Sequence, residues 1–331
     1  MTSCPRVAYF CMEYGLDPSF SIYAGGLGIL AGDHMKSVGD LHAPVTGIGL
    51  LWDEGYTRQV VGAGGAIEDQ YPKTDREAVR PIDARVDVTI RGKKVPLRAW
   101  KVERFIRSNL YLLEPEREED RWITQRLYGG GAEDRIAQEI VLGVGGVRLL
   151  DALGLPIDVF HFNEGHAVFA GLELLRQHRY GGSNMQERLA NLRSHVVFTT
   201  HTPVPAGNEV HDLALLRTLD ADLGFTDDEL AVIGEDDPRR SDRTPLLRSP
   251  GTAGSTSTPR SSSLPSRVRA KRNSSSSTVL SARSVRAISR RAAAQPSMCS
   301  ASISSAHLGR NASPRSPTWP SGRPPRHCPR R

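Results

Sequence analysis

Apolar runs of strand length alternate with helical patterns along the first 237 residues. Residues 7–12 form an apolar run that ends at the carboxylate Glu13, and a second run covers residues 43–51. A strand, a loop and then a helix is the repeating unit of α/β proteins, in which ligands bind at the carboxyl ends of the strands. The pattern therefore predicts an α/β fold, with Glu13 at the mouth of a candidate site or, equally, at an ordinary surface position.

The pattern changes in the middle of the chain. Residues 82–113 alternate between apolar and polar side chains, which indicates antiparallel strands inserted into the α/β domain. Residues 134–150 place apolar side chains around most of a helix, which predicts a buried helix. Its glycines do not indicate a nucleotide-binding loop, because no strand precedes them.

Two later strands also end in polar side chains. The run 155–162 leads into four of them within six residues: His161, Asn163, Glu164 and His166. The run 194–200 leads to His201, and Pro203 and Pro205 prevent the strand from continuing. Because parallel strands share one carboxyl edge, these side chains predict a single site. Their spacing matches no usual zinc motif, so helix capping and hydroxyl binding are preferred to metal ligation, and no metal is expected.

A glycine turn, Gly25-Gly26, opens directly onto a run that can continue as a helix from Leu27. Glycines allow a ligand to approach the backbone, and the free amides at a helix start attract an anion such as phosphate. Taken alone, such a turn more often serves close packing of a helix against a sheet than ligand binding.

Charge divides the chain into two parts. Residues 238–331 contain 19 Lys and Arg residues and one acid, Asp242, so they carry +18, whereas residues 1–237 contain 24 basic and 36 acidic residues and carry −12. The basic part is rich in Ser, Arg and Pro and has too few apolar residues for a core, so it is expected to be a disordered tail.

Cysteine spacing and hydropathy indicate a reduced, cytoplasmic setting. The four cysteines show no short paired spacing of the kind found in zinc sites or disulfide frameworks. No secretory signal precedes the first strand, and no apolar stretch approaches the length of a membrane span. We therefore expect a cytoplasmic protein without a membrane partner.

Five motifs, taken together and in this order, carry a family resemblance. They are YFCMEYGL at 9–16, YAGGLG at 23–28 with GDH at 32–34, QEIVLG at 138–143, HFNEGH at 161–166 and HTPVPAG at 201–207. Through them, residues 7–237 resemble the N-terminal part of an α-glucan phosphorylase (glycogen, starch or maltodextrin) of the shorter bacterial and archaeal type.

The resemblance implies a fold, a reaction and a cofactor. Residues 1–237 would be the Rossmann-like N-terminal half of a two-domain GT-B glycosyltransferase fold, with the active site between the domains. The implied reaction is reversible phosphorolysis of terminal α-1,4 bonds of an α-glucan by inorganic phosphate, which gives glucose 1-phosphate with retention. Pyridoxal phosphate would act through its phosphate group, and the family is often homo-oligomeric.

The resemblance also implies roles for particular residues. His201 would be catalytic and meet the reacting glucosyl unit. Gly25 and Gly26 would border the phosphate and the cofactor. The residues implied on the substrate side are Glu13, Leu27, Asn163 and Glu164.

The resemblance stops after Asp237. A phosphorylase continues into a domain with the lysine that forms the cofactor's Schiff base, but the only lysine of the tail, Lys271, lies in a segment that does not resemble that motif. We therefore expect the Schiff-base lysine to be absent and the chain to be an inactive N-terminal fragment. A frameshift, a sequencing error and a true fusion each account for such a tail.

Two other functions are alternatives to phosphorolysis. A glycogen or starch synthase shares the fold, but its usual motif has a lysine before the glycines, and Ala24-Gly25-Gly26 has none. A polyanion-binding protein would use the basic tail for weak, salt-dependent binding. Among Phe, Tyr and Trp, the tail contains Trp319 alone, so no specific nucleic-acid partner is expected.

Overall fold

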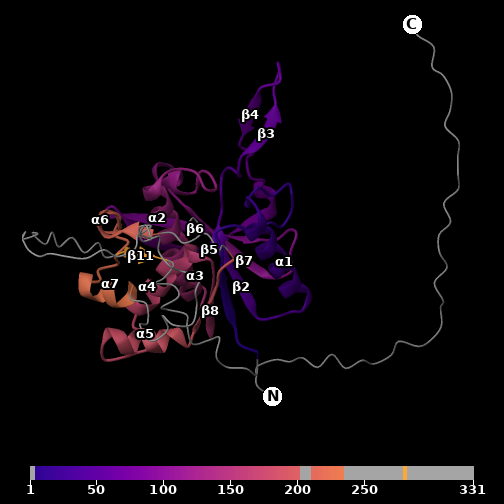
Figure 1. Cartoon of the computed structure of the whole chain (residues 1–331). Coiled ribbons are helices and arrows are strands. Elements are labelled where there is room, and N and C mark those ends of the chain that lie inside the picture. The colour runs from indigo at the N-terminus through magenta and orange to yellow at the C-terminus, as the bar shows by residue number, and fades with distance from the viewer. Residues whose placement is uncertain (1–3, 202–209, 235–278, 282–331) are drawn as a thin grey trace, which may run out of the picture. The chain divides into compact units, whose positions relative to one another are not determined.

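The computed structural model describes residues 4–201, 210–234 and 279–281 (Figure 1). All of them lie in one compact unit, which spans residues 1–296. The loop that contains Pro203 and Pro205, Lys271 and nearly all of the tail lie outside the described residues.

A seven-stranded sheet, in the order β5-β6-β7-β2-β1-β8-β9, forms the centre of the unit. Parallel pairs join β7 to β2, β2 to β1, β1 to β8 and β8 to β9, while β5, β6 and β7 pair antiparallel. The predicted α/β class and the inserted antiparallel strands are thereby confirmed. The bounds are β1 (Val7–Phe10), β2 (Val45–Leu50), β5 (Val79–Ile90), β6 (Lys93–Val102), β7 (Asn109–Pro115), β8 (Val159–Asn163) and β9 (Val196–Thr199).

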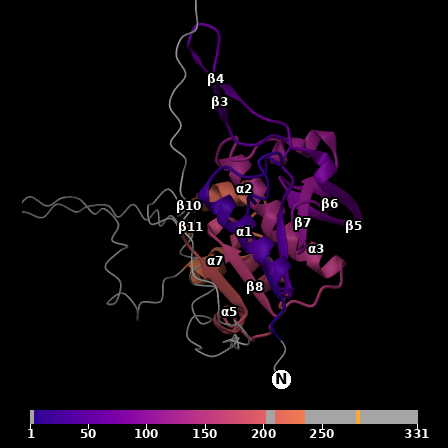
Figure 2. The ribbon, with the colours of Figure 1, turned by 90° about the vertical axis from the view of Figure 1, so that its right-hand side faces the viewer.

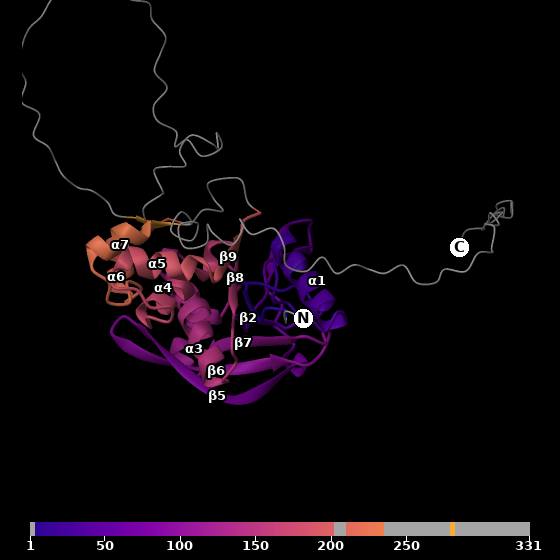
Figure 3. The same cartoon turned by 90° about the horizontal axis from the view of Figure 1, so that it is seen from below.

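Helices cover both faces of the sheet. Met35 of α1 (Gly26–Asp40) lies against Gly47 of β2, while Gly146, at the start of α3 (Gly146–Ala152), lies against Ile48, and successive strand residues face opposite sides. Figure 3 shows α1 on one side of the sheet and the later helices on the other. The later helices are α2 (Ala132–Ile140), α4 (Val168–Arg176), α5 (Met185–Arg193), α6 (Leu213–Thr218) and α7 (Asp227–Gly234).

The helix predicted at 134–150 is interrupted by a π turn. It consists of α2, the π turn η3 (Val141–Gly145) and α3. Glycines permit close packing here: a Cβ on Gly143 would lie 2.5 Å from the backbone nitrogen of Ala170, and one on Gly146 would lie 2.6 Å from Cε1 of Phe10. Their role is therefore packing, in agreement with the prediction of a buried helix.

Two small sheets accompany the central one. Strands β3 (Arg58–Val61) and β4 (Ile67–Gln70) form a hairpin that projects from the rest of the unit (Figure 2). Strand β10 (Val210–Asp212) pairs antiparallel with β11 (Val279–Ser281). The expectation of a tail without structure is therefore wrong for these three residues. Within the described ranges, no helix combines the length and the apolar character that crossing a membrane requires.

Candidate functional site

Glu13 follows β1 and holds the glycine turn in place. Its Oε2 accepts the backbone N–H of Ala24 at 2.6 Å and that of Gly25 at 3.3 Å. The residue is only 3% exposed. The structure therefore places Glu13 beside the glycine turn, but the carboxylate is buried against the backbone of the turn and is not at an open mouth, as the sequence had suggested.

Tyr128 supports the other oxygen of this carboxylate. Its hydroxyl donates to Oε1 of Glu13 at 2.6 Å, and the guanidinium of Arg135 lies 4.8 Å from the centre of its ring. Burial and the neighbouring charge of Glu13 raise the pKa of Tyr128, so the phenol keeps its proton. No motif in the sequence predicts a role for Tyr128, whose only local signal is the run of three glycines that follows it.

We expect Tyr128→Phe to lower the free energy of unfolding by about 1.5 to 3 kcal/mol, because it removes a hydrogen bond to a buried carboxylate without changing the ring. Urea denaturation followed by circular dichroism measures the difference. Tyr56→Phe is the matched control, since Tyr56 is 50% exposed. Equal stability of the Tyr128→Phe variant and the wild type would contradict the supporting role.

The start of α1 is open in front of the glycine turn. A Cβ added to Gly25 or Gly26 would meet no atom within 4 Å, and the first turn of the helix contains no acidic residue. By contrast, a Cβ on Gly28 would lie 2.7 Å from Oε2 of Glu13. Gly28 is thus required by packing, whereas Gly25 and Gly26 face free space next to the amides at the start of the helix.

Asn163 and Glu164 hold His201. The amide of Asn163 donates from Nδ2 to the hydroxyl of Tyr9 at 2.6 Å, and its Oδ1 lies 3.0 Å from Nε2 of His201. Since Oδ1 can only accept, Nε2 of His201 carries the hydrogen of this contact, and in that tautomer of the uncharged imidazole Nδ1 is an acceptor. Glu164 accepts the backbone N–H of His201 and, at 3.2 Å, the hydroxyl of Thr200.

The backbone of Glu164 is strained. Its φ of 66° and ψ of −177° lie in a region that residues other than glycine rarely occupy, at a cost of about 1 to 3 kcal/mol. Asn163 and Glu164 are 1% and 4% exposed, whereas His201 is exposed. Of these three predicted site residues, His201 is therefore the one that reaches solvent, and the other two position it.

A hollow of about 120 Å³ connects His201 to the flank of α1. Leu30 and His34 of α1 form one side, and residues of β1, β8 and the end of β9 form the other. The predicted residues therefore meet at one sheet edge as two neighbouring groups: Glu13 with the glycine turn, and Asn163 and Glu164 with His201. Within the described residues, no group of three or more His, Cys, Asp or Glu side chains is arranged to hold a metal ion.

His161 lines this hollow in its neutral form. Burial, together with the nearby rings of His34 and His201, lowers the pKa of His161 from 6.5 to about 4. Its Nε2 lies 2.7 Å from the hydroxyl oxygen of Thr199. The ring therefore remains an uncharged hydrogen-bonding group at neutral pH.

We expect acid to destabilise the domain through His161. Between pH 6.5 and about pH 4, the unfolded chain binds a proton at this residue that the folded chain excludes. The free energy of unfolding therefore falls with falling pH, by up to about 1.4 kcal/mol per pH unit across that window. Urea denaturation at several pH values measures the slope, and His161→Gln should flatten it. An unchanged slope in that variant would assign the acid sensitivity to other groups.

Comparison with known proteins identifies relatives along most of the chain. No protein-family model matches it. It is 38% identical to maltodextrin phosphorylase of Thermococcus litoralis over 244 residues. This alignment covers 70% of this chain and 29% of that protein. It is 40% identical over 265 residues to glycogen phosphorylase of Mycobacterium tuberculosis, with 71% and 30% covered. Glycogen phosphorylase of Aquifex aeolicus is 35% identical over 211 residues, with 60% and 30% covered. The chain thus spans about 30% of the length of these relatives.

Proposed function

Since this chain carries the N-terminal portion of a protein of the glycogen and maltodextrin phosphorylase family, we propose that its α/β domain forms one wall of the active site of an α-glucan phosphorylase. The protein would be a glycosyltransferase of carbohydrate metabolism, and the domain would be the Rossmann-like half of a GT-B fold. The observation that carries the proposal is the open start of α1 at Gly25 and Gly26, together with the hollow that α1 forms with the exposed residue His201.

The proposed reaction is reversible phosphorolysis of a terminal α-1,4 bond. An oxygen of hydrogen phosphate bonds to the anomeric carbon and the bond from that carbon to the bridging oxygen breaks. The bridging oxygen takes the proton of the phosphate and leaves as the new end of the glucan. The amides of Gly26 and Leu27, at the start of α1, would stabilise the phosphate charge, while the amide of Gly25 stays bonded to Glu13. Asn163 and Glu164 would hold His201 so that its Nδ1 accepts a hydrogen bond from a hydroxyl group of the glucosyl unit.

The open turn would also admit the phosphate of pyridoxal phosphate, because a Cβ added to Gly25 or Gly26 meets no atom of the described chain within 4 Å. When bound, this cofactor supplies a phosphate group that exchanges a proton with the substrate phosphate. Glu13 accepts the backbone N–H groups of Ala24 and Gly25, and Tyr128 supports Glu13. Together they would keep the glycine turn in position for the substrate phosphate and the cofactor phosphate.

Exposed apolar side chains follow the glycine turn, and they support the proposal that a second domain covers this face of the protein. Ile29 and Leu30 in the first turns of α1 are 46% and 45% exposed. Large apolar residues clustered next to a polar site are typical of surfaces that another domain covers. The relatives favour phosphorolysis over a synthase reaction or polyanion binding by the tail.

A chimera tests the proposal. Residues 1–237 would be joined to the part of Mycobacterium tuberculosis glycogen phosphorylase that lies beyond its match to this chain. With maltoheptaose, phosphate and pyridoxal phosphate, we expect the chimera to release glucose 1-phosphate, and the mycobacterial part alone should release none. A folded chimera that binds pyridoxal phosphate but releases no glucose 1-phosphate would reject the proposal.

A further inference from the structure

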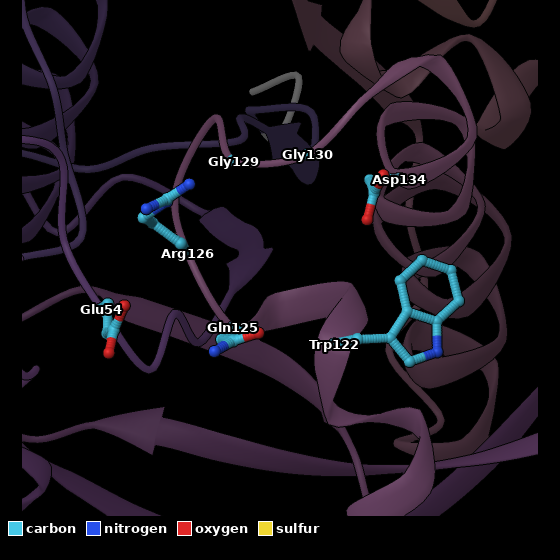
Figure 4. A pocket seen from close by; sticks show the side chains of 7 residues that line it. All are labelled: Glu54, Trp122, Gln125, Arg126, Gly129, Gly130 and Asp134. Atoms are coloured by element: carbon cyan, nitrogen blue, oxygen red, sulfur yellow. The ribbon is translucent and has the colours of Figure 1, made fainter.

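A second hollow, of about 220 Å³, lies beside the loop that carries Tyr128. Figure 4 shows Trp122 and Asp134 on one side of it and Arg126 and Glu54 on the other, with Gln125 between them. Trp122 comes from the short helix η2 (Glu118–Thr124), and Asp134 from α2. None of these five residues belongs to the site around the glycine turn and His201.

Arg126 and Gln125 supply free hydrogen-bond donors. The guanidinium of Arg126 lies 4.2 Å from the centre of the Tyr71 ring, which holds the side chain in place. Across the described parts of the chain, no carboxylate pairs with this guanidinium, and the side-chain amide of Gln125 makes no hydrogen bond. Their N–H groups are therefore available to a ligand.

Glu54 and Asp134 supply acceptors. One oxygen of Glu54 lies 2.8 Å from Nζ of Lys73, and Oδ2 of Asp134 accepts the backbone N–H of Gly131 at 2.8 Å. These contacts orient each carboxylate and use one of its two oxygens. The second oxygen of each carboxylate is outside these contacts, so the hollow offers acceptors as well as donors.

This lining selects a neutral, hydroxyl-rich ligand. Two carboxylates repel a phosphate, whereas hydroxyl groups both donate and accept hydrogen bonds. Trp122 adds apolar ring surface of the kind that stacks against C–H groups. A volume of about 220 Å³ is below the 300 to 1,000 Å³ typical of sites for larger ligands, so it suits one ring.

We propose that this hollow is a saccharide subsite that binds one hexose unit, apart from the reaction centre. That the hexose belongs to an α-1,4-glucan rests on the proposed function. The loop that lines the hollow also carries Tyr128, whose hydroxyl donates to Glu13, so this loop links the proposed subsite to the carboxylate that holds the glycine turn.

Titration of the full chain with maltotriose, followed by intrinsic tryptophan fluorescence and saturation-transfer NMR, tests the proposal. We expect saturable binding that weakens about tenfold in Arg126→Met, on the scale of a lost charged hydrogen bond. Arg117→Met is the matched control, because Arg117 is an exposed arginine outside the lining and its loss should leave the affinity unchanged. His201→Ala should also retain this binding.

A second variant separates a loss of binding from misfolding of Arg126→Met. Gln125 is exposed and its side-chain amide makes no hydrogen bond within the described chain, so Gln125→Ala should fold normally and still weaken binding several-fold. Wild-type affinity in both Arg126→Met and Gln125→Ala would overturn the proposal, as would displacement of maltotriose by inorganic phosphate or the absence of binding at millimolar concentrations. Arg126-dependent binding alongside an inactive chimera would reject the proposed reaction alone, and an active chimera with Arg126-independent binding would reject the subsite alone.

Discussion

Gly32→Ala is expected to lower the free energy of unfolding by about 3 kcal/mol or to prevent folding. A Cβ at this position would lie 2.1 Å from the carbonyl oxygen of Gly15 and 2.5 Å from its carbonyl carbon. Overpacking of a core usually costs about 1 to 3 kcal/mol, and the upper end applies here because backbone cannot rotate out of the way as a side chain can. Chemical denaturation followed by circular dichroism measures the loss.

The matched control is the same substitution at Gly26. A Cβ there would meet no atom within 4 Å, so Gly26→Ala should leave the free energy of unfolding within about 0.5 kcal/mol of the wild type. In the chimera, however, it should weaken phosphorolysis, because the added methyl enters the space assigned to the anion. Equal losses of stability in the two variants would show that the close contact between α1 and Gly15 is not what requires glycine at position 32.

In the chimera, His201→Ala should reduce the rate of phosphorolysis about 10²- to 10³-fold. Losing one preorganised polar group at a reacting centre typically costs this much. The substitution keeps the backbone N–H that Glu164 accepts, so the strand end should stay in place while Nδ1 is lost. Initial rates of glucose 1-phosphate release from maltoheptaose, at saturating phosphate, measure the effect.

Asp33→Asn provides the control for this prediction, because Asp33 is exposed on α1 and, among the residues that the structure describes, its carboxylate makes only a 3.8 Å surface contact with Lys36. Its rate should match that of the parent chimera. A His201→Ala chimera with near-normal rates and normal folding would remove His201 from the proposed reaction and leave the glycine turn as its main support.

Local periodicity determined the fold class of this protein. Strands β1, β2, β8 and β9 follow from short apolar runs, and the antiparallel β5 and β6 follow from alternation, because a strand's pattern depends on neighbours two residues away. The same patterns placed Glu13, Asn163, Glu164 and His201 at strand ends, which a parallel sheet then brings to one edge. Composition likewise separated the basic segment after residue 237 from the acidic part before it.

The tertiary structure alone decided what these residues contact. Tyr128 supports Glu13 across 115 positions of sequence, and no local pattern encodes a pairing that depends on the order of strands in the sheet. The same is true of glycines: Gly26 faces open space, whereas Gly32 packs against the backbone of Gly15. Asn163 and Glu164 are buried, and buried polar atoms need hydrogen-bond partners that only the folded chain brings within reach. His201 is such a partner for both residues, so they position it.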